Sequence, residues 1–167
     1  TALRNKQLGE MTVKFSGLKP PRFASLFEAL VNGVCFQQLS IAAGTSLLNR
    51  LVAFGLVSAG RRAFPGPEDL AKITPGELKS IGFSMNKARA LVAFSRAIAY
   101  EGLDLESLVS LADDEVIKTL DGIRGVGPWT AQYVLLRGMG RLSIFPSGDS
   151  GASRNLNRFF GFGEPLD

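Results

Sequence analysis

The chain has 167 residues, of which 46% are hydrophobic and 20% charged, which fits one compact domain with a buried core and excludes a disordered tail. It contains no histidine and a single cysteine, Cys35, so it cannot by itself form a Ser-His-Asp triad, a zinc finger or a four-cysteine iron–sulfur cluster. Nineteen Lys and Arg against fifteen Asp and Glu give a net charge of +4, which favours a polyanionic partner without requiring one.

The sequence gives no sign of a membrane or an export signal. No apolar run reaches the roughly 18 residues that a membrane span needs, and the first residues lack the apolar core of a signal peptide. The lone cysteine cannot form an internal disulfide. We therefore expect an intracellular protein, cytoplasmic at the nucleoid if the source is prokaryotic, with no membrane partner.

Helical spacing of apolar residues dominates the chain. An amphipathic helix is predicted from Phe23, after Pro20 and Pro21, and a second runs from Ile41 to near Gly55. Residues 60–67 are predicted to be a loop, and a short helix to begin at 67. Further helices are predicted over residues 75–81, 85–100, 105–111, 113–120, 128–138 and 150–160, with 11–15 as the best strand candidate. The predicted class is all-α.

Three glycines, at 122, 125 and 127, separate two apolar helical stretches and are followed by Pro128. Glycine adopts backbone conformations that expose its amide, and proline at the first helical position leaves no donor unsatisfied. Such a turn can present free amides to a phosphate oxygen. An ordinary interhelical turn with glycine at the helix end fits the same residues.

The excess positive charge is concentrated in and after this turn. Between residues 122 and 163 there are five arginines and one aspartate, a net of +4, so the rest of the chain is neutral overall. This distribution is typical of a phosphate-contacting surface, although arginines on solvated helix faces would also produce it.

Three segments in chain order resemble the helix-hairpin-helix (HhH-GPD) DNA glycosylases, and within them the 3-methyladenine DNA glycosylase II (AlkA-like) family. They are residues 36–40 (FQQLS), 123–131 (IRGVGPWTA) and 145–149 (FPSGD), the last followed by Arg154. The resemblance implies a helical bundle of about eight to ten helices. It also implies an extension at residues 1–20 and a glycosylase domain at 21–167, with the hairpin near 113–138. We expect the N-terminal β domain of the bacterial prototype and the closing C-terminal helix to be missing.

In that family the aspartate of the third segment is catalytic, and the matching residue is Asp149, 20 positions after Trp129. A carboxylate beside the anomeric carbon would stabilise the positive charge that develops when an N-glycosidic bond breaks, and would help orient the attacking water. The alternative is that Asp149 only caps the helix that follows it.

Trp129 occupies the position where relatives that also cut the DNA backbone carry a lysine. Tryptophan has no amine for a Schiff base, so the resemblance implies a monofunctional enzyme without lyase activity. Trp129 and Tyr133 are four residues apart and share a helix face, so both rings could stack on an extruded base in a base pocket. Core packing is the alternative for both.

The first segment would supply the residue that fills the gap left by the flipped nucleotide, with Gln38 preferred and Gln37 next. Exposed or helix-capping glutamines remain the alternative. The remaining predicted DNA contacts are Gly125, Gly127, Thr130 and Arg154. Ser84, Asn86 and Lys87, in a second and similar hairpin, are candidates for the backbone of the opposite strand.

No cofactor is expected to be required. The family often holds Na⁺ or K⁺ through backbone carbonyls, which here would be those of Asp121, Ile123 and Val126. The predicted function is base excision repair of alkylated purines in duplex DNA by a monomeric hydrolase. The alternatives are a non-catalytic HhH DNA-binding module and a glycosylase for deaminated or oxidised bases.

Overall fold

The computed structural model describes residues 6–58 and 60–161, so the terminal residues of the two predicted segments, 1–5 and 162–167, lie outside it. Its α-helices are α1 (Lys6–Lys14), α2 (Leu26–Phe36), α3 (Ile41–Leu51), α4 (Pro67–Ala71), α5 (Pro75–Ser80), α6 (Met85–Tyr100), α7 (Asp113–Asp121), α8 (Pro128–Val134) and α9 (Ser150–Phe160). Two 3₁₀ turns, η2 (Val52–Phe54) and η3 (Glu106–Ser110), and a π-helical turn, η4 (Leu135–Met139), complete the helical structure. The predicted all-α class is confirmed.

One antiparallel ribbon interrupts the helices. It joins β1 (Val57–Ser58) to β2 (Arg61–Arg62), with Val57 opposite Arg62 and Ser58 opposite Arg61. It falls partly in the predicted loop and is too short to form a sheet of its own. Among the described residues no helix is long and apolar enough to cross a membrane.

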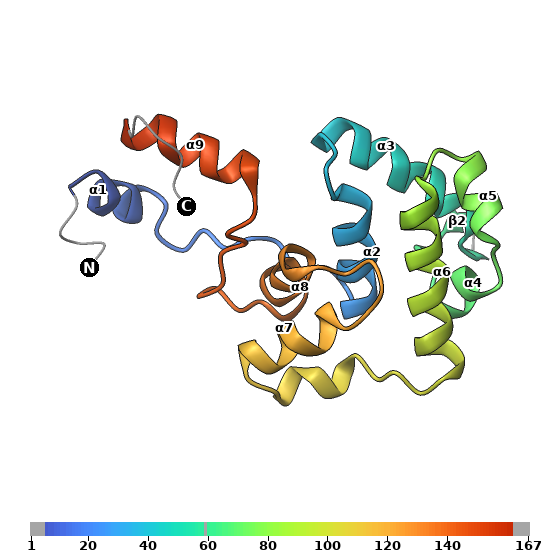
Figure 1. Cartoon of the computed structure of the whole chain (residues 1–167). Coiled ribbons are helices and arrows are strands. Elements are labelled where there is room, and N and C mark those ends of the chain that lie inside the picture. The colour runs from blue at the N-terminus through green and yellow to red at the C-terminus, as the bar shows by residue number, and fades with distance from the viewer. Residues whose placement is uncertain (1–5, 59, 162–167) are drawn as a thin grey trace.

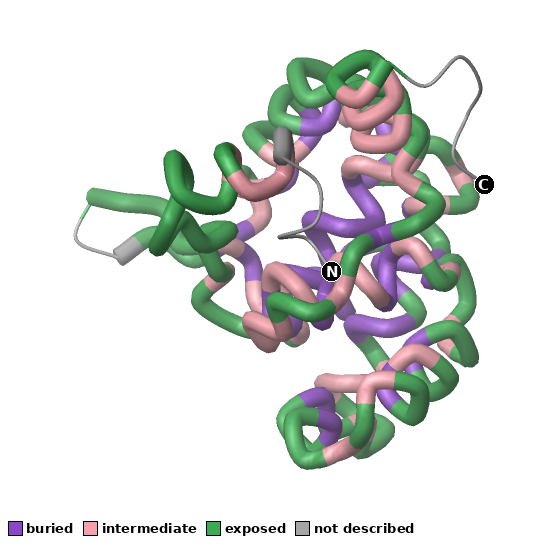
Figure 2. The backbone as a smooth tube through the Cα atoms, turned by 90° about the vertical axis from the view of Figure 1, so that its left-hand side faces the viewer, coloured by how far each residue is buried: buried purple, intermediate pink, exposed green. Residues whose placement is uncertain are grey.

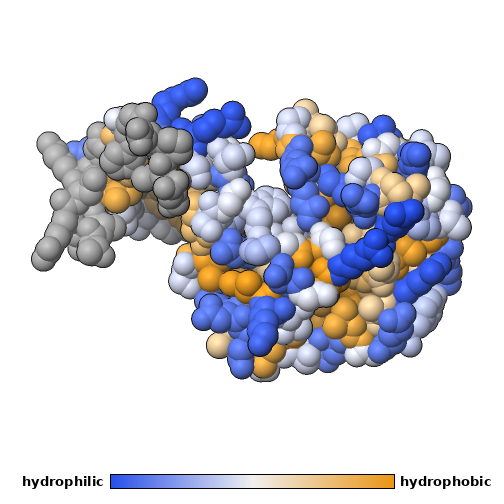
Figure 3. All heavy atoms as spheres, viewed as in Figure 1, coloured by the Kyte–Doolittle hydropathy of each residue, from blue (hydrophilic) through white to orange (hydrophobic). Residues whose placement is uncertain are grey.

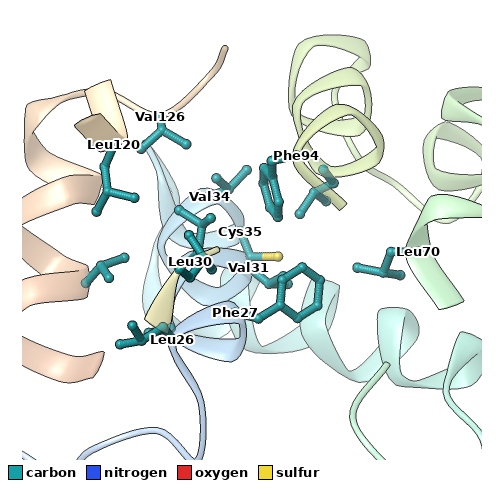
Figure 4. Packing of buried hydrophobic residues seen from close by; sticks show 14 of the residues in the cluster. Leu26, Phe27, Leu30, Val31, Val34, Cys35, Leu70, Phe94, Leu120 and Val126 are labelled. Carbon is teal, nitrogen blue, oxygen red and sulfur yellow. The ribbon is translucent and has the colours of Figure 1, made fainter. Parts of the chain in front are cut away.

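α2 is the centre of the core. Nine of its eleven residues are buried, as expected for a helix that is apolar on every side. It packs against α3, α6, α8 and η4, and Phe27 meets Phe94 of α6 edge to face at 5.9 Å between ring centroids (Figure 4). α4 and α5 cover α6, and α7 packs on α8, which produces the continuous buried interior in Figure 2.

Two sequence predictions about helices were wrong. Residues 11–15 do not form a strand, because α1 continues to Lys14. The Thr12 hydroxyl donates to the Leu8 carbonyl at 2.7 Å, so this hydroxyl finds its hydrogen-bond partner within the helix. α2 begins at Leu26, not Phe23, because the Ser25 hydroxyl caps the helix by accepting from the Glu28 amide.

The residues just before α2, 21–23, run along α8 and η4, and we call this segment the strap. The Phe23 amide donates to the Arg137 carbonyl at 2.9 Å, and the Arg22 guanidinium donates twice to the Gly138 carbonyl. α9 lies to the left of the bundle in Figure 1, at the end of the connection that follows η4, and none of its residues is buried. The strap leads from α1 and this connection leads to α9, and these two helices lie on the same side of the bundle in Figure 1.

Candidate active site

A cleft of about 1450 Å³ lies between the α2–α3 loop, α8 and the first turn of α9. In Figure 3 it opens as a notch at the top of the molecule, between α9 and the start of α3. Eight of the predicted site residues line it, although they are far apart in sequence: Gln37, Gln38, Gly127, Trp129, Thr130, Tyr133, Asp149 and Arg154. The fold therefore assembles in one place most of the residues singled out from the sequence.

Asp149 is fixed at the start of α9 and faces the cleft. Its Oδ1 accepts a hydrogen bond from the Ala152 amide at 2.9 Å, so the capping role considered from sequence is confirmed. Its Oδ2 accepts from the indole Nε1 of Trp129 at 3.3 Å. The carboxylate therefore lies between the N-terminal end of α9 and the indole N–H. Capping and a chemical role are compatible, because each oxygen has its own partner.

Two stacked rings form the wall beside this carboxylate. Trp129 and Tyr133, one turn apart on α8, lie with ring centroids 5.4 Å apart and planes 24° from parallel. Both are only partly buried and both line the cleft, so neither is a pure core residue. Burial raises the pKa of the Tyr133 phenol, an effect that the Arg137 charge opposes, so the ring stays neutral at physiological pH.

Phe23 and Arg137 extend the aromatic wall and were missed by the sequence analysis. The Phe23 ring lies 6.1 Å from that of Tyr133, and the Arg137 guanidinium lies 5.0 Å from the Phe23 ring centroid and 5.7 Å from that of Tyr133. Arg137 also donates to the Pro21 carbonyl at 2.6 Å. The helical spacing 129, 133, 137 was a signal that could have placed Arg137 on this face.

The hairpin turn between α7 and α8 has the geometry that its glycines predicted. Gly125 has φ 84°, and a Cβ there would overlap the Cβ of Ala90 on α6, so only glycine fits. The Val126 amide closes the turn on the Ile123 carbonyl at 2.9 Å. Within the described part of the chain, the amides of Gly125 and Gly127 donate no hydrogen bond, which leaves them available to a ligand.

Gln37 and Thr130 are joined by a hydrogen bond between their side chains. The Gln37 Nε2 donates to the Thr130 hydroxyl and to the Gly125 carbonyl, both at 2.9 Å. Thr130 is 1% exposed and its hydroxyl accepts from Gln37, and its contact with DNA stays a prediction. These bonds tie the α2–α3 loop to the hairpin. Gln38, the next residue, is exposed at the mouth of the cleft.

The positive charges after the hairpin are less available than their sequence positions suggested. Arg137 is held as described above, and Arg141 pairs with Asp113 and donates to the carbonyls of Val109 and Leu111. The Nζ of Lys87 donates to the carbonyls of Cys35 and Gln37, and its contact with the DNA backbone stays a prediction. Arg154 is exposed at the cleft, and its Nε donates to the Ser150 carbonyl.

Comparison with known proteins gives relatives with one recurring name. A DNA-3-methyladenine glycosylase of Bacillus subtilis is 36% identical over 156 residues, covering 87% of this chain and 52% of that protein. DNA-3-methyladenine glycosylase 2 of Escherichia coli is 31% identical over 149 residues, covering 84% of this chain and 51% of that protein. The chain thus spans about half the length of these curated relatives.

Solved structures share the fold. The 3-methyladenine DNA-glycosylase from Archaeoglobus fulgidus superposes with a TM-score of 0.82 at 26% identity, over 99% of this chain and 57% of that one. The Schizosaccharomyces pombe 3-methyladenine DNA glycosylase in complex with abasic DNA gives the same TM-score at 23% identity, over 99% and 80%. A family profile described as HhH-GPD superfamily base excision DNA repair protein matches residues 31–165. Together with the cleft and the hairpin, this match shows that the chain belongs to the HhH-GPD superfamily of base excision DNA repair proteins.

Proposed function

We propose that this protein is a monofunctional DNA glycosylase that extrudes an alkylated purine, of the 3-methyladenine or 7-methylguanine type, from duplex DNA and hydrolyses its glycosidic bond. The observation that carries the proposal is the contact between Asp149 and Trp129, which joins a helix-capped carboxylate to a stacked aromatic pair inside one cleft. The names of the relatives described above point to the same substrate class.

The chemistry needs one carboxylate and no histidine. Alkylation of a purine ring nitrogen makes the base cationic, so the C1′–N bond can break with its electron pair leaving on the base and no proton donor is required. Asp149 would stabilise the positive charge that develops on the sugar. Water then adds its oxygen to C1′, and its proton passes to the carboxylate or to solvent. The products are a free base and an intact abasic strand.

The aromatic wall would bind the extruded base. Stacking of a base on an aromatic ring contributes about 1–3 kcal/mol, and a cationic base gains further from the negative ring face. Trp129 would provide this face next to Asp149. The Arg137 guanidinium already lies over the rings of Phe23 and Tyr133. A cationic base would therefore bind at the Trp129 end of the aromatic wall, away from this positive charge.

The DNA duplex would be held around this cleft. The free amides of Gly125 and Gly127 suit a phosphate, the exposed Arg154 adds charge, and Gln38, which lines the cleft, would enter the base stack. Na⁺ or K⁺ on the carbonyls of Asp121, Ile123 and Val126 stays a prediction. Ile123 fits it in part, since its carbonyl accepts one hydrogen bond and keeps a second lone pair.

Lyase activity is not part of the proposal, because none of the described residues that line the cleft is a lysine. By the family resemblance Trp129 stands at the lysine position, and the Nζ of Lys87 donates to the carbonyls of Cys35 and Gln37. The protein is proposed to act as a monomer inside the cell. A non-catalytic DNA-binding module is the second candidate, and the orientation of Asp149 towards Trp129 speaks against it.

The test is an excision screen on duplexes that carry 3-methyladenine, 7-methylguanine, hypoxanthine, uracil or 8-oxoguanine. The alkylated purines are expected to be released, and the Asp149→Asn variant is expected to release none while it still binds abasic DNA. Borohydride is expected to trap no covalent adduct. Undiminished excision by Asp149→Asn would exclude the carboxylate as the catalytic group, and release of only oxidised bases would contradict the substrate class.

A further inference from the structure

The α2–α3 loop holds Gln38 in a conformation that most residues avoid. Among the described residues, Gln38 is the only one other than glycine with a positive φ, 53°. A side chain is disfavoured in the left-handed region, so such a residue persists only where its surroundings fix it. The contacts on either side of Gln38 therefore decide whether it stays at the mouth of the cleft.

Lys87 makes the contact that precedes Gln38. From the first turn of α6, its Nζ donates to the carbonyl of Cys35 at 2.9 Å and to that of Gln37 at 2.7 Å. The Gln37 carbonyl belongs to the peptide bond that leads into Gln38. These carbonyls lie at the end of α2, where helical donors are missing and the helix dipole is negative, so an ammonium group suits the position.

Two further anchors complete the loop. The Gln37 side chain is bonded to Gly125 and Thr130 of the hairpin, as described above. After Gln38, the Leu39 amide donates to the Phe36 carbonyl at 3.1 Å, and the Ser40 hydroxyl caps α3. Lys87 is the only one of these anchors that reaches the loop from α6, so its loss would free the peptide before Gln38 on that side.

The surroundings of Lys87 indicate that the ammonium serves these carbonyls and not an acidic partner. It is partly buried, and within the described residues it forms no ion pair. Burial raises the pKa of the neighbouring Cys35 thiol to about 12, so this thiol is neutral at physiological pH. Two of the three ammonium donors are used on the loop.

We infer that Lys87 is a positioning residue of the glycosylase proposed above: by bonding the Gln37 carbonyl it holds Gln38 ready to enter the base stack, without itself contacting DNA. This inference rests on the proposed function for the role of Gln38. The contact itself is a property of the free protein, so it can be tested separately.

The first experiment measures the loop without DNA. Hydrogen exchange at the amides of Gln37 and Leu39 is compared in the wild type, Lys87→Met, Lys87→Arg and Lys72→Met. Lys72 is an exposed lysine at the end of α4, remote from the cleft lining, and serves as the control for charge. Faster exchange in Lys87→Met alone is expected, and unchanged exchange would overturn the inference whether or not the protein is a glycosylase.

The second experiment measures base extrusion. The fluorescence of 2-aminopurine beside a tetrahydrofuran abasic analogue reports unstacking, and single-turnover release of 7-methylguanine reports excision. Lys87→Met is expected to lower both by about tenfold, with affinity for undamaged duplex changed by less than about threefold, and Lys87→Arg is expected to recover most of the loss.

Two outcomes would separate the failures. If Lys87→Met weakens binding to undamaged duplex as much as it weakens extrusion, and the salt dependence of binding falls, then Lys87 contacts phosphate and the inference is wrong. If the wild type neither extrudes nor excises any base, the proposed function has failed. The exchange measurement then still decides whether Lys87 holds the loop.

Discussion

Replacing Trp129 with phenylalanine isolates the hydrogen bond between the indole and Asp149. Phenylalanine keeps an aromatic ring on α8 for stacking, but it removes the Nε1–H that donates to the Asp149 Oδ2 at 3.3 Å. A hydrogen bond to a charged group contributes about 1.5–3 kcal/mol. The distance here is longer than the usual range for N–H···O bonds, so the low end, about 1.5 kcal/mol, applies.

This free energy corresponds to a roughly tenfold slower chemical step, since each 1.36 kcal/mol changes a rate about tenfold. The assay is single-turnover release of 7-methylguanine with enzyme in excess, which separates chemistry from product release. Tyr133→Phe is the matched control, because it keeps the stacked ring and leaves the Asp149 contact intact. Its expected change is less than about twofold.

Trp129→Ala removes stacking as well and is expected to lose a further 1–3 kcal/mol, about 5-fold to 160-fold in rate. If Trp129→Phe releases the base as fast as the wild type, the indole does not orient the carboxylate and the reasoning is refuted. The same conclusion follows if Trp129→Phe and Tyr133→Phe slow release equally.

Three other perturbations test the surrounding structure. Gly125→Ala is expected to lower the free energy of unfolding by about 2–4 kcal/mol in a denaturant titration, because φ is positive and the new methyl group overlaps Ala90. Gly102→Ala, where φ is also positive but nothing lies within 4 Å, should cost only about 1–2 kcal/mol, and equal losses would contradict the close approach. The pKa of Glu77 is lowered because its carboxylate accepts from the amide and hydroxyl of Thr74, so its stabilisation is present above its unfolded pKa and lost as the pH falls through its folded pKa. Glu77→Gln should therefore be less stable than the wild type at neutral pH, with the difference shrinking as the pH falls through the folded pKa of Glu77, and a pH-independent difference would argue against this contact. Arg137→Met should raise the pKa of Tyr133 further in an absorbance titration, since the guanidinium over the ring lowers it, and an unchanged titration would place the charge elsewhere.

The helices that were predicted most closely carry their own start signals. α6 and α9 have the predicted bounds, and each begins at a side-chain cap, Ser84 and Asp149. α4 and α5 begin at prolines, as expected. The predictions were wrong where contacts with segments distant in sequence determine the local structure. Phe23 fits a helical pattern, but its amide bonds to Arg137, which is remote in sequence, and so it belongs to the strap.

The candidate site divides in the same way. The family resemblance named Asp149, Trp129, Tyr133 and Gln38, and the cleft contains all four. The residues that hold them in place were not predicted, because Lys87 and Arg137 act through carbonyls and ring faces of segments distant in the chain. Carbonyl acceptors leave no trace in side-chain patterns, so sequence alone could not show which cations turn inward.

This distinction changes what the net charge of +4 means. Arg137, Arg141 and Lys87 all donate to backbone carbonyls of the protein, so these three cations contribute to the fold. At the hairpin the uncharged amides of Gly125 and Gly127 are left for a phosphate beside the exposed Arg124, with Arg154 at the edge of the cleft. A site built from fixed amides depends more on geometry than on charge, because an amide binds a phosphate only at a defined distance and angle.

The strict requirement for glycine at position 125 then has two causes, the turn conformation and the contact with α6. Lys87 extends from that same helix, α6, to the Gln37 carbonyl, so the packing of α6 fixes both the hairpin that would hold the DNA and the loop that would enter it.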